Sequence, residues 1–163
     1  DARIAMIYEG ANGIQALDLV GRKMPAHMGR YLRRFFHPIQ DWIGAHTADP
    51  DLQPFVLPLA KAFGRLQMAT GQIAKAGLKD PNEAAAASSE YLKLFALVAL
   101  GFLWARMAQT AMRQKDSSEP EFYEAKIKTA QFFMERVLPQ TGALFSSIMA
   151  GSSTLMNFSD DAF

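Results

Sequence analysis

Residues 91–112 read YLKLFALVALGFLWARMAQTAM, and the fold follows from this stretch. Lys93, Arg106 and Gln109 interrupt a segment that is otherwise apolar nearly all round. A helix with apolar side chains on every face is stable only when neighbouring elements contact it from several sides. We therefore predict a long central helix here, with the remaining helices packed around it.

Strong helix-start signals frame this central helix. In Asp80-Pro81-Asn82-Glu83, we expect Asp80 to cap the helix, Pro81 to be its first residue and Glu83 to complete a capping box. This helix could run to about residue 114. The string Ser118-Glu119-Pro120-Glu121 is a second start signal of the same type.

The second start signal opens a helix with a favourable pair of charges. Glu124 and Lys128 are spaced to form an ion pair on its polar side. Pro139 is expected to end or bend the helix. A last helix should cover about residues 140–150, and the chain from Gly151 onward is expected to be frayed.

Three further helices are predicted before the central one. The first covers about residues 14–23, with Asn12 as its cap and Ile14, Leu17 and Val20 on one stripe. The second covers residues 28–46 and should kink or split at Pro38. The third runs from about residue 51 to 77, and its apolar stripe faces the core.

These segments together predict an all-α protein. No segment alternates apolar and polar residues with a period of two, which would indicate a strand. The architecture expected is an antiparallel bundle of about four long helices, preceded by a leading helix-turn segment.

Composition excludes several classes of protein. The chain has 163 residues, 17 Lys and Arg against 16 Asp and Glu, and no cysteine. Near-neutrality argues against a nucleic-acid binder, and the missing thiols exclude a disulfide scaffold and fit a reducing, cytoplasmic compartment. The longest apolar run, residues 94–105, is too short for a membrane span, so we expect none. We also expect that the chain, which starts with Asp1, was processed or cut from something longer.

Side chains that could bind a ligand are few. His27, His37 and His46 lack the spacing that puts two ligands on one helical face, so no metal site is predicted. One basic cluster stands out, with interleaved aromatics, and it is either a solvated helix face or an anion or nucleic-acid site. Its members are Arg22, Lys23, Arg30, Arg33 and Arg34.

The first 23 residues carry a recognisable signature. The strings IYEG at residues 7–10 and NGIQALDLVGRK at residues 12–23 resemble the C-terminal signature of the flavin-dependent acyl-CoA dehydrogenases. The second string is similar to the branch that has a long C-terminal helical extension and includes 3-methylmercaptopropionyl-CoA dehydrogenases. The resemblance implies that residues 1–23 end the catalytic helical domain and that residues 24–163 form the extension.

The resemblance also implies a catalytic role for Glu9. In the family this glutamate removes the α-proton of an acyl-CoA thioester while the β-hydride passes to N5 of FAD, which gives a 2,3-enoyl-CoA. Its backbone N–H would help bind the thioester oxygen, and Tyr8 and Gly10 would shape the pocket. The family usually has threonine where this chain has Ala11, so one contact to the flavin is expected to be missing.

The parent enzyme implied by the resemblance needs more than these 163 residues. It would bind FAD between this part, an N-terminal helical domain and a β-domain, act as a homo-oligomer and pass electrons to an acceptor such as an electron-transfer flavoprotein. We expect the isolated chain to bind no FAD and to be inactive. Two alternatives remain: a non-catalytic helical interaction or oligomerisation module, and a DNA-contacting C-terminal domain.

Overall fold

The computed structural model describes residues 11–114, 118–159 and 161, and every regular element in these ranges is helical. The prediction of an all-α fold is therefore confirmed. The elements are α1 (Ala11–Asp18), η2 (Leu19–Lys23), α2 (Ala26–His46), α3 (Gln53–Gly77), α4 (Pro81–Arg113), α5 (Pro120–Phe132), η3 (Phe133–Val137), η4 (Leu138–Gln140), α6 (Thr141–Met149) and α7 (Ser153–Met156).

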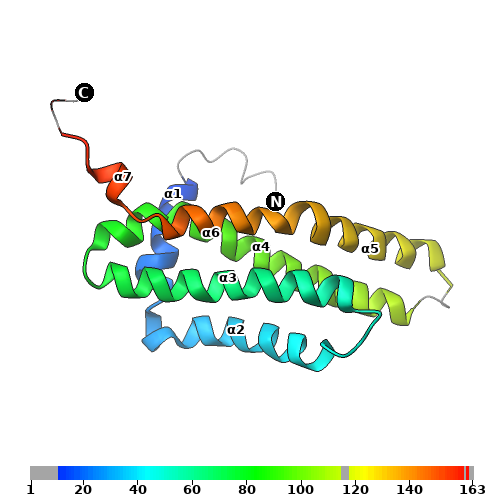
Figure 1. The fold of residues 1–163 in the computed structure, drawn as a ribbon. Coiled ribbons are helices and arrows are strands. Elements are labelled where there is room, and N and C mark those ends of the chain that lie inside the picture. The colour runs from blue at the N-terminus through cyan, green and yellow to red at the C-terminus, as the bar shows by residue number, and fades with distance from the viewer. Residues whose placement is uncertain (1–10, 115–117, 160, 162–163) are drawn as a thin grey trace.

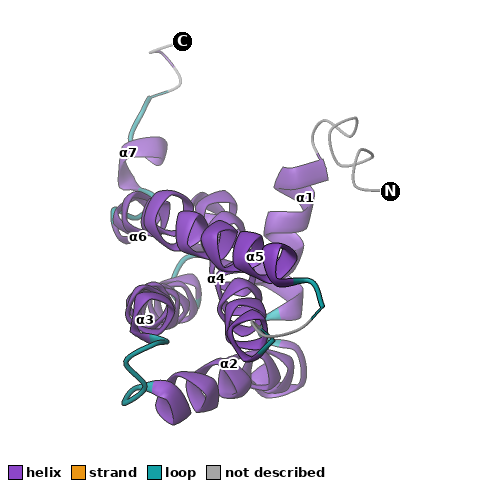
Figure 2. Cartoon of the chain, turned by 90° about the vertical axis from the view of Figure 1, so that its right-hand side faces the viewer, coloured by secondary structure: helices purple, strands orange, loops and turns teal. Residues whose placement is uncertain are grey.

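Four rods make up the bundle. In Figure 1, α2, α3, α4 and the rod formed by α5 and α6 run side by side and alternate in direction. Seen along the rods in Figure 2, α4 lies among the others, and α1 lies at its side away from α3. α4 packs against α3, α5, α6 and α1, which is the central position predicted from its apolar faces.

The core along α4 contains both buried apolar side chains and a hydrogen bond to α3. Tyr91, Leu94 and Val98 are fully buried. The Tyr91 hydroxyl lies 2.7 Å from Oγ1 of Thr70 on α3. Burial raises the pKa of the Tyr91 phenol to about 12, so the ring stays neutral and the hydroxyl keeps its hydrogen-bond partner.

α4 is long and apolar enough to cross a membrane by length and composition. A third of its most apolar window is buried inside the bundle. Core helices of globular proteins pass the same test, so this helix is only a weak indication of a membrane span.

The predicted start of the first helix was wrong. α1 begins at Ala11, so Asn12 lies inside the helix and does not cap it. The predicted stripe is also only partly buried, because Val20 faces the core while Ile14 and Leu17 are exposed. The helix then loosens into the π-helical turn η2, which ends before Pro25.

The break in the second helix was predicted at the wrong residue. The backbone leaves the helical conformation at His27, Met28 and Gly29, where φ is 50°, 54° and 73°. The helix continues through Pro38, whose side chain is exposed. A proline there removes one hydrogen bond on the solvent side, while Ile39 and Trp42 remain packed on the core side.

The cap of α4 was predicted only in part. The Asp80 carboxylate accepts a hydrogen bond from the Asn82 N–H at 2.9 Å, as expected. The Glu83 carboxylate, however, does not close a capping box. It accepts hydrogen bonds from the hydroxyl (2.6 Å) and the backbone N–H (3.3 Å) of Ser152.

This contact with Glu83 anchors Ser152, near the start of the segment that was expected to be frayed. Gly151 turns the backbone with a φ of +75°, Ser152 is buried, and the short helix α7 follows. A carboxylate from the start of α4 thus satisfies two donors of Ser152, whereas residues 153–159 are exposed.

The C-terminal rod follows the sequence prediction closely. Glu124 and Lys128 form the expected ion pair at 2.6 Å, which lowers the pKa of the Glu124 carboxyl. The rod bends through η3 and η4 around Pro139. Its start is shifted, because Glu119, not Ser118, occupies the N-cap position.

We predict that Gly151→Ala destabilises the chain. An alanine there would have to adopt a positive φ, and its Cβ would lie 3.0 Å from Oε2 of Glu83. The free energy of unfolding should fall by about 1–2 kcal/mol in urea denaturation. Gly71→Ala is the control, because Gly71 lies in α3 with nothing near its Cβ position and should tolerate alanine or gain stability. Equal effects of the two variants would contradict this account of Gly151.

Candidate functional site

The residues predicted to carry chemistry lie at the start of the chain. Tyr8, Glu9 and Gly10 fall outside the described residues, so their roles stay predictions. Ala11 is the first residue of α1 and is half-buried. α1 packs against α4, and this contact fixes the position of Ala11, the first described residue.

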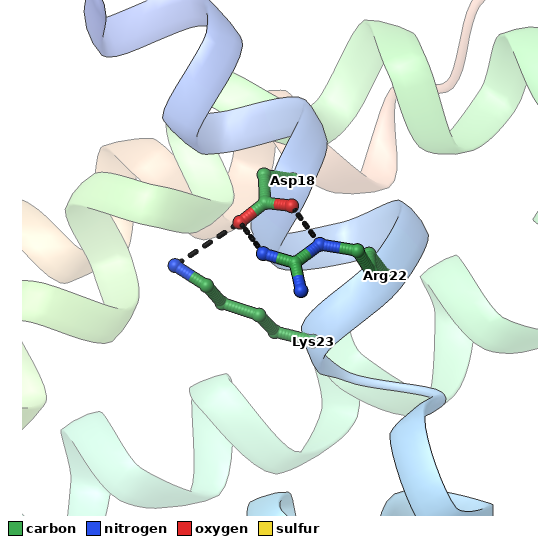
Figure 3. A network of polar contacts seen from close by, with 3 residues as sticks. All are labelled: Asp18, Arg22 and Lys23. Carbon is green, nitrogen blue, oxygen red and sulfur yellow. Dashed lines mark hydrogen bonds and ion pairs between the residues drawn. The ribbon is translucent and has the colours of Figure 1, made fainter.

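A network of charges ties the end of α1 to η2. Arg22 donates to both carboxylate oxygens of Asp18, at 2.9 Å between Nη2 and Oδ2 and through Nε to Oδ1. The Lys23 ammonium lies 3.1 Å from Oδ2, as Figure 3 shows. The two cations lower the pKa of the Asp18 carboxyl to about 2, mainly through their hydrogen bonds.

This network changes the interpretation of the basic cluster. Arg22 and Lys23 are partnered by Asp18, and Arg33 donates through Nη1 to the Met28 carbonyl at 2.7 Å. The turn at residues 27–29 interrupts the helix between Lys23 and the later arginines. The cluster is therefore not one continuous cationic face, which weakens its interpretation as an anion or nucleic-acid site.

Two of the interleaved aromatic rings are part of the packing. Phe35 stacks on Phe95 of α4 with ring centroids 4.4 Å apart, and Phe36 meets Phe63 of α3 edge-on at 5.2 Å. Tyr31 is half-exposed and packs edge-on against His27. Phe35 and Phe36 hold α2 against the bundle and are not free to stack on bases.

A large apolar groove lies where α1 and η2 meet the α3–α4 turn. We call it the seam groove; its volume is about 790 Å³. Thr70 is the one hydroxyl residue among its lining residues. Leu17, Val20, Met24, Met28 and Leu32 form one wall, and Ile73, Ala74, Leu78, Ala84 and Ala85 form the other.

A polar network that the sequence did not reveal joins α2 to α4. Nδ1 of His46 donates to the Trp42 carbonyl at 2.7 Å, so Nε2 is free to accept from the Gln109 amide at 2.5 Å. The indole N–H of Trp42 donates to Oε1 of Gln109 at 3.1 Å. The partners are more than 60 residues apart, so no local pattern could have indicated the contact.

None of the three histidines belongs to a cluster of metal-binding side chains among the described residues. His27 and His37 are exposed, and His46 uses both ring nitrogens in the network with Trp42 and Gln109. Among residues 11–114, 118–159 and 161, no three side chains of the types that bind metals come together.

Comparison with known families identifies the helical part of the chain. A family model described as acetyl-CoA dehydrogenase C-terminal like matches residues 35–159, well over half of the sequence. The chain belongs to this family. The match starts inside α2, so α1, η2 and the turn at residues 27–29 lie before the matched residues.

Curated relatives match nearly the whole chain. A 3-methylmercaptopropionyl-CoA dehydrogenase of Ruegeria pomeroyi is 34% identical over 98% of the chain, and a broad-specificity linear acyl-CoA dehydrogenase, FadE5, of Mycobacterium tuberculosis is 27% identical over all of it. A butyryl-CoA dehydrogenase of Syntrophomonas wolfei is 23% identical. The chain spans 27–28% of the length of these relatives.

We predict that Asp18 makes stability depend on pH in the acid range. Its pKa is lowered from 3.8 to about 2 in the folded chain, so the folded state holds the carboxylate charged at a pH where the unfolded chain is protonated. The stabilisation is complete above a pH of about 4 and is lost as the pH falls towards about 2. In circular dichroism melts, the difference in Tm between wild type and Asp18→Asn should shrink over that interval.

The control for this titration is Asp41→Asn, which changes an exposed carboxylate that forms no described ion pair. Its Tm should follow the wild type throughout. A constant difference between wild type and Asp18→Asn from pH 5 to pH 2 would contradict the assignment.

We predict that Gln109→Ala weakens the packing of α2 on α4. The substitution leaves the Trp42 indole N–H and the His46 Nε2 without their partner, which should cost about 1–3 kcal/mol in the free energy of unfolding. Urea denaturation followed by tryptophan fluorescence measures the change. Gln67→Ala, at an exposed position of α3, should have almost no effect; if both variants unfold alike, the network does not stabilise the bundle.

Proposed function

We propose that the chain is the C-terminal part of an FAD-dependent enzyme that oxidises acyl-CoA thioesters to 2,3-enoyl-CoA. One observation carries this proposal: the similarity to the Ruegeria pomeroyi dehydrogenase extends over 98% of the chain. It therefore includes nearly all of residues 1–34, which the family model leaves out. That is the segment in which Glu9 lies.

In this proposal Glu9 is the catalytic base. The α-proton of a thioester is weakly acidic, and a carboxylate removes it efficiently when its pKa is raised towards the working pH by a dry pocket. Negative charge then develops on the thioester oxygen and requires N–H donors, one of them the backbone N–H of Glu9. Tyr8 and Gly10 would form the pocket wall and the turn beside the base.

Two features of the described residues bear on where FAD would bind. Ala11, which stands where the family usually has threonine, offers no hydroxyl, and the seam groove has Thr70 as its one hydroxyl residue. We therefore assign FAD binding mainly to the part of the parent that precedes this chain. When bound there, FAD supplies the acceptor for the hydride from the β-carbon.

The proposed domain division follows from the same assignment. Residues 1–23 would end the catalytic helical domain, and residues 24–163 would form the extension, which covers the active-site entrance or builds a homodimer contact. The proposed partners are acyl-CoA, the N-terminal and β domains of the parent and an acceptor such as an electron-transfer flavoprotein. The absence of cysteine supports a cytoplasmic location.

The test uses the visible spectrum of the full-length parent under anaerobic conditions. Addition of acyl-CoA thioesters of different chain lengths should bleach the flavin, and Glu9→Gln should slow bleaching by at least roughly 100-fold, because a general base contributes about 10²–10⁴ in rate. The flavin content of the variant should stay unchanged.

Glu124→Gln is the matched control, since Glu124 is an exposed carboxylate paired with Lys128 on α5. It should bleach at the wild-type rate. Bleaching that persists in Glu9→Gln would remove Glu9 from the mechanism. A flavin that no acyl-CoA bleaches in the wild-type parent would favour the non-catalytic interaction module instead.

A further inference from the structure

Large apolar side chains on the walls of the seam groove are unusually exposed to solvent. Met28 and Leu78 are each 90% exposed on its two walls, and Leu17 of α1 is 50% exposed. Single exposed apolar residues are common on protein surfaces, but a contiguous apolar patch around a groove marks an interaction site. The groove has a volume of about 790 Å³, against about 410 Å³ for the hollow that Pro58 and Pro139 line.

The two walls of the groove come from different parts of the chain. One wall comes from α1, η2 and the turn at residues 27–29, all of which precede the start of the family match at residue 35. The other wall comes from α3 and α4, which lie within the family's C-terminal domain. The groove therefore follows the seam between that domain and the segment that joins it to the rest of the parent.

We propose that the seam groove is the docking surface for the part of the parent polypeptide that precedes residue 1. The proposal rests on one part of the proposed function, that this chain is the C-terminal part of a longer parent, and not on the activity of that parent. The chain spans only 27–28% of those relatives, so most of the polypeptide lies outside it. The missing part connects through α1, whose Leu17 lines the groove and is half-exposed.

The backbone beside the groove supports a built contact. His27 and Met28 adopt positive φ angles, which cost free energy for residues other than glycine. Arg33 donates to the Met28 carbonyl at 2.7 Å, and the Gly29 N–H donates to the Pro25 carbonyl at 3.3 Å. These hydrogen bonds hold the turn in a strained conformation in which the Met28 side chain is exposed to solvent. An exposed Met28 side chain contributes no packing energy to the isolated chain.

Thiol labelling in the full-length parent tests the proposal. The chain has no cysteine, so a single introduced thiol reports its own position, and peptide mass spectrometry reads it separately from thiols elsewhere in the parent. We compare Met28→Cys and Leu78→Cys with Met68→Cys, a control at a 61% exposed position of α3 that lines none of the described grooves. Maleimide should label positions 28 and 78 at least roughly tenfold more slowly than position 68.

A photo-crosslinking maleimide attached to Leu78→Cys then identifies the occupant. Cross-linked peptides should come from the polypeptide that precedes residue 1, within the same subunit. Equal labelling rates at positions 28, 68 and 78 would overturn the proposal. So would cross-links to residues 11–163 of a second copy, with protection that disappears on dilution, because the groove would then be an oligomer contact.

The same samples separate this proposal from the proposed function. Each variant parent is also tested for flavin bleaching by acyl-CoA. Protected thiols in a parent that oxidises no acyl-CoA would refute the proposed function and leave the docking surface standing. Reactive thiols in a parent that oxidises acyl-CoA would refute the docking surface alone.

Discussion

The burial of α4 is the constraint on which the rest of the structure depends. Its apolar side chains point in every direction around the helix axis, so no single neighbour can cover them. α3, α5, α6 and α1 each take part of its surface. The alternating direction of the long helices follows, because the short connections between neighbours allow only antiparallel packing.

Polar contacts then fix which helix ends meet. The Glu83 carboxylate at the start of α4 binds Ser152 beyond α6, and Gln109 near its end binds Trp42 and His46 of α2. Each contact satisfies groups that would otherwise be left without partners in half-buried surroundings, and such groups are expensive. These hydrogen bonds give the bundle a unique arrangement that apolar packing alone would specify less sharply.

α1 lies before the residues that the family model matches, and its apolar side chains are only partly covered. α1 is tied down through α4 and through the Asp18 network, yet it leaves Ile14 and Leu17 uncovered. A helix that buries one face and exposes apolar residues on another is suited to lie between two bodies. This position of α1 fits a chain that spans only 27% of the length of its Ruegeria pomeroyi relative. In the proposed enzyme, α1 connects the catalytic segment around Glu9 with the helical bundle.

The sequence could predict those features that depend on local physics. The apolar faces of residues 91–112 indicated the central helix, Asp80 and Pro81 its start, and the spacing of Glu124 and Lys128 their ion pair. The predictions failed where contacts that the sequence pattern does not indicate decide the conformation. Glu83 binds Ser152 and not its own helix start, and the second helix breaks at residues 27–29, where Arg33 holds the turn, while Pro38 stays helical on an exposed face.

The features of the candidate site also divide into those that the sequence indicated and those that only the tertiary structure decided. A short signature indicated the family, which the family model confirms, and the catalytic role of Glu9 stays a prediction. The seam groove, the partnering of Arg22 and Lys23 by Asp18, and the Trp42–Gln109–His46 network were decided only by tertiary structure. The physical reason is that helical periodicity defines which side chains share a face, whereas packing between helices defines which faces meet and which remain uncovered.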